Sequence, residues 1–231
     1  MKFNQQYNSR AIEIWRQFNS LHQRVPLLVP DCHADLDMLI IGMNPSFRVD
    51  EITKQIATIE SLKKYTTDQL FNWNDGDLID ERLDHLVEWE SHVLRTDKQY
   101  YKQICGFVND CGLTRWAHID LFLMRETKQK LALNVVGYND SNGSLNDFGN
   151  AQVELCLDAI RLSKAKLVVV ANAAASAILL HAISKSTHSV TRIDYMGMPI
   201  YFAGMLSGQR ALDRFSKQRL IDQIRYDQLA N

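Results

Sequence analysis

The sequence predicts an α/β fold, a three-layer αβα sandwich with a central, mainly four-stranded parallel sheet. Four short apolar runs are too short for helices and are typical of strands buried on both faces. Segments with helical periodicity separate these runs, and strands that alternate with helices form parallel sheets covered on both sides. Polar residues follow the runs directly, at the edge of the sheet where α/β proteins bind ligands.

The expected strands occupy 37–41, 116–123, 167–171 and 199–203. The third, Leu-Val-Val-Val-Ala, is the clearest, because it is apolar throughout. The first ends at Gly42, which lets the backbone turn sharply or approach a ligand closely. The second mixes apolar residues with His118 and Asp120, and we expect His118 to be a core histidine. A polar loop, 124–127, follows it.

Helical periodicity predicts the remaining layers. Ile12, Trp15 and Phe18 share one stripe of a helix over 8–23. Further helices are expected at 52–59, 80–94, 98–110, 150–163, 173–184 and 212–229. Two segments rich in Asn, Asp and Gly, 66–80 and 137–147, are predicted to be a loop or insertion and a mobile linker.

The chain has 231 residues, enough for a single α/β domain over 1–231, with a helical and loop insertion at about 52–95. Its 46% hydrophobic and 23% charged residues are ordinary for a globular protein. No apolar run approaches the length of a membrane span, and the first residues lack the apolar core of a signal peptide. We therefore expect a cytoplasmic protein without membrane contact. The sequence leaves the oligomeric state open, and our expectation is a monomer.

The four cysteines form no CxxC pair and have no histidine partner at zinc-finger spacing. This pattern favours free, mostly buried thiols. We expect neither a metal nor a cofactor.

The net charge of −1 argues against coating of nucleic acid by bulk electrostatics. The composition still allows a local basic face, because residues 208–225 contain five basic side chains and only two acidic ones. Such a run is also typical of an ordinary solvated helix face.

The candidate site is built around Gly42-Met43-Asn44-Pro45-Ser46-Phe47, which places a carboxamide, a rigid proline, a hydroxyl and an aromatic ring directly after a strand. The alternative is an ordinary strand that ends in a Gly/Asn/Pro turn. Polar side chains also follow the later strands, namely Asp120, Asn172, Ser207, Gln209 and Arg210. Convergence of these loops at one rim predicts a pocket for a small molecule or a base.

Residues 42–46 resemble the first motif of the uracil-DNA glycosylase superfamily, which reads Gly-(Ile/Met)-Asn-Pro-Gly in its mismatch-specific, thymine-DNA and single-strand-selective branches. Residues 119–127 resemble the strand and loop that read the base edge in that superfamily. Residues 205–210 are similar in position to its second motif, commonly His-Pro-Ser or Asn-Pro-Ser-Gly. The three landmarks lie in the right order over about 38–215.

This resemblance implies a hydrolase of base-excision DNA repair that cleaves the N-glycosidic bond of a damaged or deaminated base in DNA. It implies Asn44 and Ser207 as catalytic residues, with Asn44 positioning the attacking water. The residues implied at the base are Gly42, Met43, Ser46, Phe47, Asp120 and Asn172. The residues implied at the DNA are Gln209, Arg210, Arg214 and Lys217.

The chemistry explains these residue types, because negative charge grows on the departing base as the bond breaks. Backbone N–H groups from Met43 to Phe47 could stabilise that charge, and the Phe47 ring could stack on a flipped base. Other roles stay open at this point: Asp120 could pair with Arg125 or cap a helix, and Asn172 could be a helix N-cap.

The sequence departs from the family pattern at four positions. Asp120 stands where an amide or hydroxyl commonly reads the pyrimidine. Ser46 replaces a glycine, and Met205 and Leu206 stand where the second motif has His or Asn and then Pro. Met205 cannot donate to a departing base, and it or Leu206 could instead wedge into the base stack or pack in the core. The alternative functions are therefore a non-catalytic nucleobase- or DNA-binding module of the same fold, and an unrelated small-molecule α/β enzyme.

Overall fold

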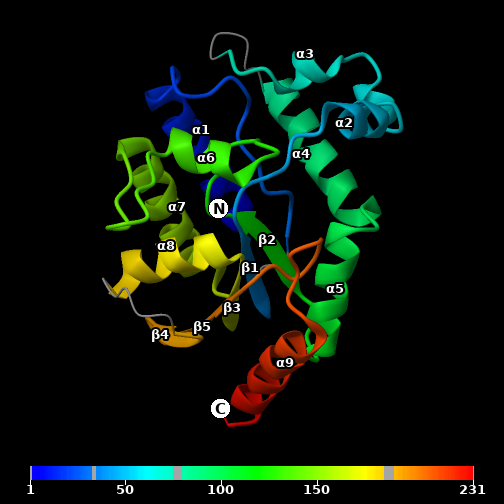
Figure 1. Ribbon diagram of the computed structural model, residues 1–231. Coiled ribbons are helices and arrows are strands. Elements are labelled where there is room, and N and C mark those ends of the chain that lie inside the picture. Colours follow the sequence, from blue (N-terminus) through cyan, green and yellow to red (C-terminus); the bar gives the residue numbers. More distant parts are fainter. Residues whose placement is uncertain (1, 33–34, 75–79, 185–189, 231) are drawn as a thin grey trace. The chain divides into compact units, whose positions relative to one another are not determined.

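The computed structural model in Figure 1 describes residues 2–32, 35–74, 80–184 and 190–230. The chain divides into two compact units. Unit 1 comprises Met1–Cys32, Asn44–Thr96 and Asp120–Ala159, and unit 2 comprises His33–Met43, Asp97–Ile119 and Ile160–Asn231. A single domain over 1–231 with an insertion at 52–95 stays a prediction. Residues 75–79 of the expected 66–80 loop lie outside the described residues.

The sheet has five strands in the order β2-β1-β3-β5-β4. They are β1 (Met38–Gly42), β2 (Trp116–Asp120), β3 (Leu167–Ala171), β4 (Arg192–Tyr195) and β5 (Met198–Ala203). β1, β3 and β5 are parallel, whereas β4 runs antiparallel to β5. The α/β class and the mainly parallel sheet are thus confirmed. The sequence analysis missed β4 because charged residues alternate with apolar ones there, as in a half-exposed edge strand.

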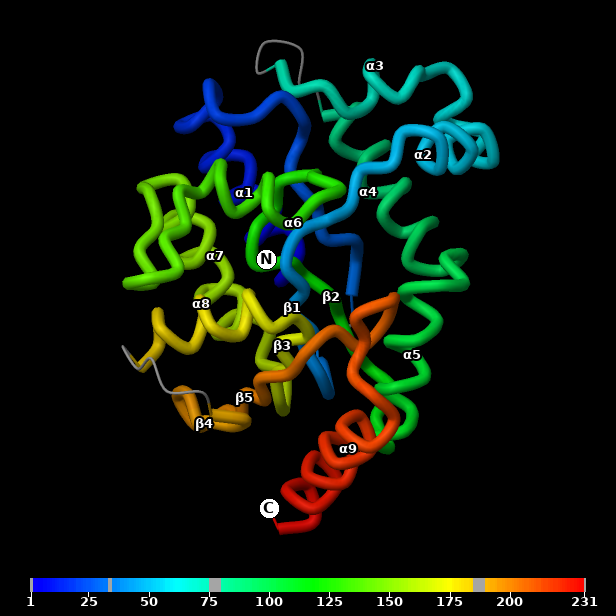
Figure 2. The backbone as a smooth tube through the Cα atoms, in the orientation of Figure 1, coloured from blue at the N-terminus to red at the C-terminus, as the bar shows by residue number. Residues whose placement is uncertain are grey.

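Helices cover both faces of the sheet in unit 2. One face packs on α5 (Tyr100–Asp110) and α9 (Arg214–Leu229) through a shared core that includes Ile40, Val169 and Tyr201. The alternate residues of β3 point to the other face, where α8 (Ala173–Ser184) contacts β3 and β5. Figure 2 shows α8 and α9 on opposite sides of these strands. This is the three-layer arrangement that the sequence predicted.

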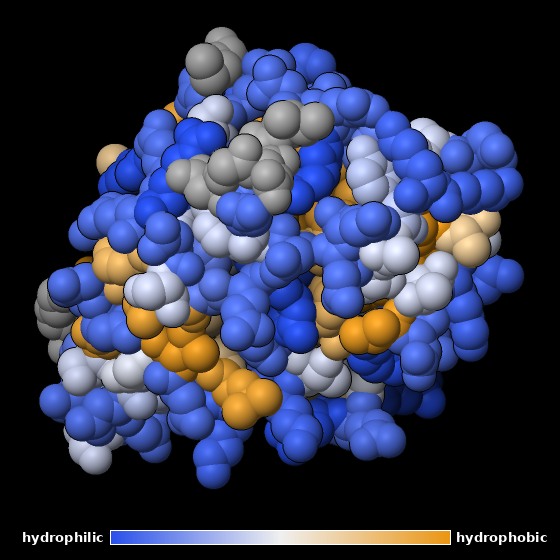
Figure 3. Space-filling model, turned by 90° about the horizontal axis from the view of Figure 1, so that it is seen from above, coloured by the Kyte–Doolittle hydropathy of each residue, from blue (hydrophilic) through white to orange (hydrophobic). Residues whose placement is uncertain are grey.

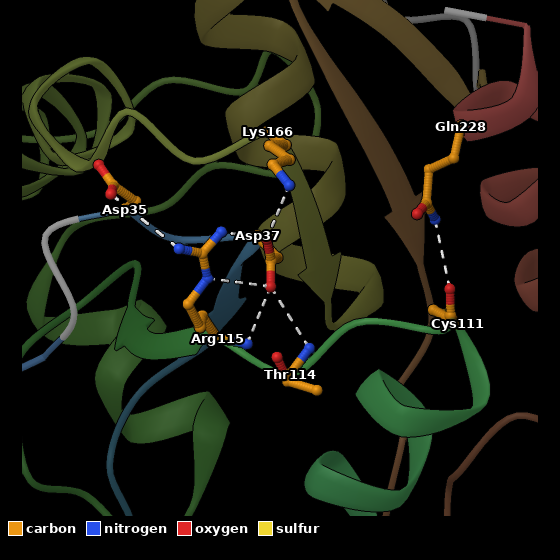
Figure 4. A network of polar contacts seen from close by, with 7 residues as sticks. All are labelled: Asp35, Asp37, Cys111, Thr114, Arg115, Lys166 and Gln228. Carbon is orange, nitrogen blue, oxygen red and sulfur yellow. Dashed lines mark hydrogen bonds and ion pairs between the residues drawn. The ribbon is translucent and has the colours of Figure 1, made fainter.

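A buried carboxylate ties together the starts of three strands (Figure 4). Asp37, just before β1, accepts hydrogen bonds from the Arg115 guanidinium at 2.9 Å and the Arg115 backbone N–H at 3.0 Å. Lys166, just before β3, reaches the same carboxylate at 2.9 Å. The Arg115 hydrogen bond is the main reason why the pKa of Asp37 lies well below its ordinary value. This cluster therefore fixes the amino-terminal end of the sheet.

Unit 1 is mainly helical. It contains α1 (Phe3–Gln17), α2 (Val49–Ile56), the 3₁₀ turn η1 (Glu60–Leu62), α3 (Thr67–Phe71), α4 (Asp80–Thr96), α6 (Gln129–Val135) and most of α7 (Asp147–Ser163). The helices expected near 80–94 and 150–163 are confirmed. The first helix begins and ends earlier than the predicted 8–23, and Phe18 is already its C-cap.

Two segments of unit 1 differ from the predicted loops. Thr66 forms a capping box with Gln69, and this starts the short α3 helix, which buries Leu70 and Phe71. In the segment predicted as a mobile linker, Asn139 and Ser144 form an isolated antiparallel bridge. In both places polar turn residues cap or pair the backbone locally, which a composition-based prediction does not distinguish from a loop.

Among the described residues, no helix has the combination of length and apolar character that membrane crossing requires. The face drawn in Figure 3 is mostly hydrophilic, with small separate hydrophobic patches. Scattered apolar side chains of this kind are normal at protein surfaces.

Candidate functional site

In unit 1, the loop that follows β1 is joined to the loop that follows β2. The Glu126 N–H donates to the Pro45 carbonyl at 3.0 Å, and the Thr127 hydroxyl donates to the Phe47 carbonyl at 2.6 Å. The Asn44 Nδ2 donates to the Glu126 carbonyl at 2.6 Å. These bonds hold the Asn-Pro-Ser-Phe segment in one conformation against residues 126 and 127.

The orientation of the Asn44 carboxamide follows from its partners. Besides Glu126, Nδ2 also contacts the Pro45 carbonyl at 3.3 Å. Carbonyl oxygens only accept hydrogen bonds, so the NH₂ group must face them. The Oδ1 atom therefore points away, and nothing within the described part of the chain donates to it. Asn44 presents a fixed acceptor on a half-buried side chain.

The backbone around Asn44 also offers donors. Within the described ranges, the consecutive N–H groups of Ser46 and Phe47 reach no protein acceptor, and Pro45 before them has no N–H. Ser46 is exposed. Unpaired backbone amides are strong donors that need a partner from solvent or a ligand. These two N–H groups are therefore unpaired within the protein, and their role as donors to a base stays a prediction.

Phe47 does not present the open stacking face that we expected. Its side chain is only 7% exposed, the Arg24 guanidinium lies over the ring at 4.1 Å from the centroid, and Phe71 contacts it edge-on. Arg24 is held there, because it donates to the Arg125 carbonyl at 2.9 Å. The prediction is wrong because a cation–π contact from a distant part of the chain covers the ring.

Arg24 was not among the candidates, and its sequence neighbourhood gives no signal of this role. It lies 3.7 Å from the Glu126 carboxylate as well as over Phe47. A guanidinium between an aromatic ring and two loop residues is recognisable only in three dimensions.

Arg125 anchors the second loop from inside unit 1. The sequence placed it in a polar loop, and the structure shows that its side chain is buried. The guanidinium forms an ion pair with Glu90 and donates to the carbonyls of Val25 and Pro26 at 3.1 and 3.0 Å. It also lies over the Trp89 ring. Arg125 thus fixes the backbone that carries the Glu126 carbonyl, the partner of Asn44.

Asp120 is a buried carboxyl at the end of β2, only 5% exposed. Burial, followed by the nearby Glu90 charge, raises its pKa to about 8, and Arg125 opposes this shift. Burial also raises the pKa of Glu90. At neutral pH the Asp120 side chain is therefore mostly a neutral acid, which offers one donor and one acceptor.

Asn172 in unit 2 is an N-cap. Its Oδ1 accepts hydrogen bonds from the N–H groups of Ala174 at 2.9 Å and Ala175 at 3.2 Å, in the first turn of α8. This confirms the capping alternative. The helix occupies the carboxamide oxygen, and the contact of Asn172 with a base stays a prediction.

The segment after β5 resembles the second motif only in position. Leu206 is buried in the core shared by α5 and α9, so it cannot serve as a wedge. Met205 is half-buried, and its carbonyl accepts from the Leu212 N–H at 2.8 Å. Ser207 is buried beside them. Core packing of Leu206, which the sequence left open, is therefore confirmed.

The predicted DNA-contacting residues lie at the start of α9 and just before it. Gln209, Arg210 and Arg214 are exposed. Lys217 is half-buried, with its ammonium 5.9 Å from the centroid of the Phe107 ring. Three of the four side chains are therefore exposed, and their contact with DNA stays a prediction.

The predicted residues divide between the two units. Unit 1 holds Asn44, Ser46, Phe47 and Asp120; unit 2 holds Gly42, Met43, Asn172, Ser207, Gln209, Arg210, Arg214 and Lys217. Their assembly into one site stays a prediction. Each unit also has a hollow of its own, of about 510 Å³ beside α2 and α3 and about 760 Å³ between α8, β5 and α9. None of the predicted residues lines either hollow.

A scan against protein-family models and a search of curated proteins both give no match to this chain. The four cysteines are free thiols. Within the described ranges, no three His, Cys, Asp or Glu side chains gather into a potential metal site.

Proposed function

We propose that this protein hydrolyses the N-glycosidic bond of a damaged or deaminated base in DNA, with Asn44 positioning the water. The observation that carries the proposal is the orientation of the Asn44 carboxamide. Two carbonyls hold its NH₂ group, at 2.6 and 3.3 Å, and this leaves Oδ1 as a fixed acceptor. An acceptor fixed in this way can orient a water molecule without reorganising during the reaction.

The water oxygen would form a bond to the anomeric carbon while the bond from that carbon to the base nitrogen breaks. The bonding electron pair leaves with the base, and the proton of the water passes to the base or to solvent. An amide cannot take up this proton as a carboxylate can, so we expect slow turnover. The unpaired N–H groups of Ser46 and Phe47 would stabilise the negative charge on the base.

Asp120 would select the base in this proposal. A neutral carboxyl can donate to a carbonyl oxygen and accept from a neighbouring N–H, which is the pattern on one edge of uracil, thymine, hypoxanthine and xanthine. An ionised carboxylate offers no donor. The raised pKa of Asp120, about 8, therefore fits a deaminated base.

The test uses oligonucleotides that each contain one uracil, hypoxanthine, xanthine or thymine opposite guanine, with abasic sites as the product. We expect release from at least one of them, and a loss of about 100-fold or more in Asn44→Ala. Asn8→Ala is the matched control, because the Asn8 carboxamide also binds backbone in unit 1, at Val29. It should keep its activity. No release from any of the four would rule the proposal out.

A non-catalytic module that binds a nucleobase or DNA is the second candidate. Two observations favour it: the Phe47 ring is covered by Arg24, and Leu206 belongs to the core. Such a module would bind DNA saturably, with affinity that falls as salt rises, and would form no abasic product. Binding that is insensitive to salt would exclude phosphate contacts by Arg210 and Arg214.

A further inference from the structure

The solvent-facing side of α9 carries an unusual stripe of four residues, Phe215, Arg219, Asp222 and Tyr226. At about 100° per residue, these positions lie within about 60° of one another on the helix. They lie opposite Ile221 and Ile224, which are buried in the core. Phe215 is 74% exposed and Tyr226 is 69% exposed. Two large rings therefore face solvent directly away from the core.

The charged members of this stripe are not committed to ion pairs. Arg219 donates to the Ser216 hydroxyl at 2.9 Å, and Asp222 accepts from the Gln218 amide at 2.8 Å. Across the described ranges, neither has an oppositely charged group within ion-pair distance. Both charges remain available to a partner.

The order of the four residues is self-complementary. The midpoint between Phe215 and Tyr226 falls between residues 220 and 221, and the midpoint between Arg219 and Asp222 falls at the same place. A two-fold axis through this point would set each residue opposite its counterpart on an antiparallel helix. A two-fold interface requires this reciprocity.

We propose that the α9 stripe is an interface for a second copy of this chain. Phe215 packs against Tyr226 of the partner subunit, and Arg219 pairs with Asp222 of the partner subunit; each contact occurs twice. Helices in such pairs lie about 8–10 Å apart and cross at about 20°. One helix from each subunit gives a small interface, so we expect a weak dimer that forms at micromolar concentrations.

The mixed charge of the stripe favours a second copy over nucleic acid. Asp222 lies in its middle and would repel a phosphate backbone. Arg214, which the resemblance implies at the DNA, is about 100° away around the helix from Phe215 and is not a member of the stripe. The proposed contacts do not use Arg214, and the inference stands independently of the proposed function.

The test is the oligomeric state of the full chain, measured by sedimentation equilibrium from about 5 to 500 µM. We expect Arg219→Glu and Asp222→Lys each to weaken the dimer about tenfold or more, since each places like charges opposite one another. The two substitutions together restore opposite charges and should return the dissociation constant to within about threefold of the original. Arg225→Glu makes the same charge change on an exposed position outside the stripe, and should have little effect.

A second measurement checks the register. Phe215→Cys and Tyr226→Cys proteins, both lacking the exposed Cys105, are mixed under mild oxidation. The disulfide between the Phe215→Cys and Tyr226→Cys proteins should form faster than a disulfide between two copies of either protein, because the proposed pairing brings these two positions together. A monomer over the whole concentration range, or a dimer that is unchanged by the charge reversals, would overturn the proposal. Circular dichroism confirms that each variant keeps its helices.

Discussion

At the scale of single residues, the chemistry of this protein depends on how side chains are held by backbone. Asn44 and Asn8 are both half-buried asparagines of unit 1, but Asn8 uses both ends of its carboxamide on Val29. Asn44 uses only its NH₂ end. The sequence identified Asn44 as a candidate, but only the positions of the two carbonyls show which end is free.

Replacement of Asn44 by Asp tests that orientation. The carboxylate of Asn44→Asp cannot donate to the carbonyls of Glu126 and Pro45, and would repel them. We expect the free energy of unfolding to fall by about 2 kcal/mol at pH 7, against about 1 kcal/mol for Asn44→Ala. At pH 3 the introduced carboxyl is protonated and can donate to the Glu126 carbonyl, so the loss in free energy of unfolding of the Asn44→Asp variant should become smaller. Chemical denaturation at both pH values measures this; equal losses for the two variants would contradict the assigned orientation.

At the scale of elements, the sequence predicted what depends on local pattern and missed what depends on distant contacts. β1, β3 and β5 are confirmed because buried parallel strands are continuous apolar runs. Asn172 was recognisable as a cap, since asparagine before an alanine-rich helix is a strong signal. The covering of Phe47 by Arg24 and the burial of Arg125 were not predictable, because their partners lie far away in the chain.

The capping role of Asn172 makes a prediction for α8. Asn172→Ala removes the acceptor for two backbone N–H groups and should lower the free energy of unfolding by about 1 kcal/mol. Asn172→Asp keeps an acceptor oxygen for these two N–H groups, so it should lose less stability than Asn172→Ala. Neither variant should change base release if Asn172 has no contact with the base. Thermal unfolding and the abasic-site assay measure the two effects separately.

At the scale of the whole molecule, buried ionisable groups set how stability depends on pH. Burial lowers the pKa of His118 to about 4, so the folded protein keeps this ring neutral while the unfolded chain protonates it below its ordinary value of 6.5. Stability from His118 is therefore lost as pH falls from about 6.5 to about 4. Asp120 acts in the opposite direction. Its pKa is about 8 in the folded protein, against an ordinary value of 3.8 in the unfolded chain. Stability from Asp120 is therefore lost as the pH rises from about 3.8 to about 8.

These two opposing effects predict a plateau of stability between about pH 4 and 6.5, where they cancel. Above it, His118 no longer opposes Asp120, so stability falls up to about pH 8. The raised pKa of Glu90 adds a loss in the same direction as pH rises above its ordinary value of 4.5. Below it, stability from Asp37 is lost as pH falls under the ordinary pKa of 3.8, because the unfolded chain takes up a proton while the folded carboxylate, whose pKa is lowered chiefly by the Arg115 hydrogen bond, stays ionised. Acid and weak alkali should therefore both destabilise the protein, for different reasons in different places.

The Asp120→Asn variant separates the alkaline loss of stability from the acid loss, because it keeps the shape of the side chain and removes the titrating group. The decline from pH 6.5 to 8 should become shallower, and the advantage of the variant over the original protein should grow by about 4 kcal/mol between pH 5 and pH 8. The variant should also show a rise in stability from pH 4 to 6.5, since the opposing effect of His118 is then uncovered. Melting temperatures across this range test both expectations, with Asp37→Asn as the control that changes only the acid loss. A constant difference between the Asp120→Asn variant and the original protein at every pH would mean that Asp120 is ionised in the fold, and so cannot donate to a base.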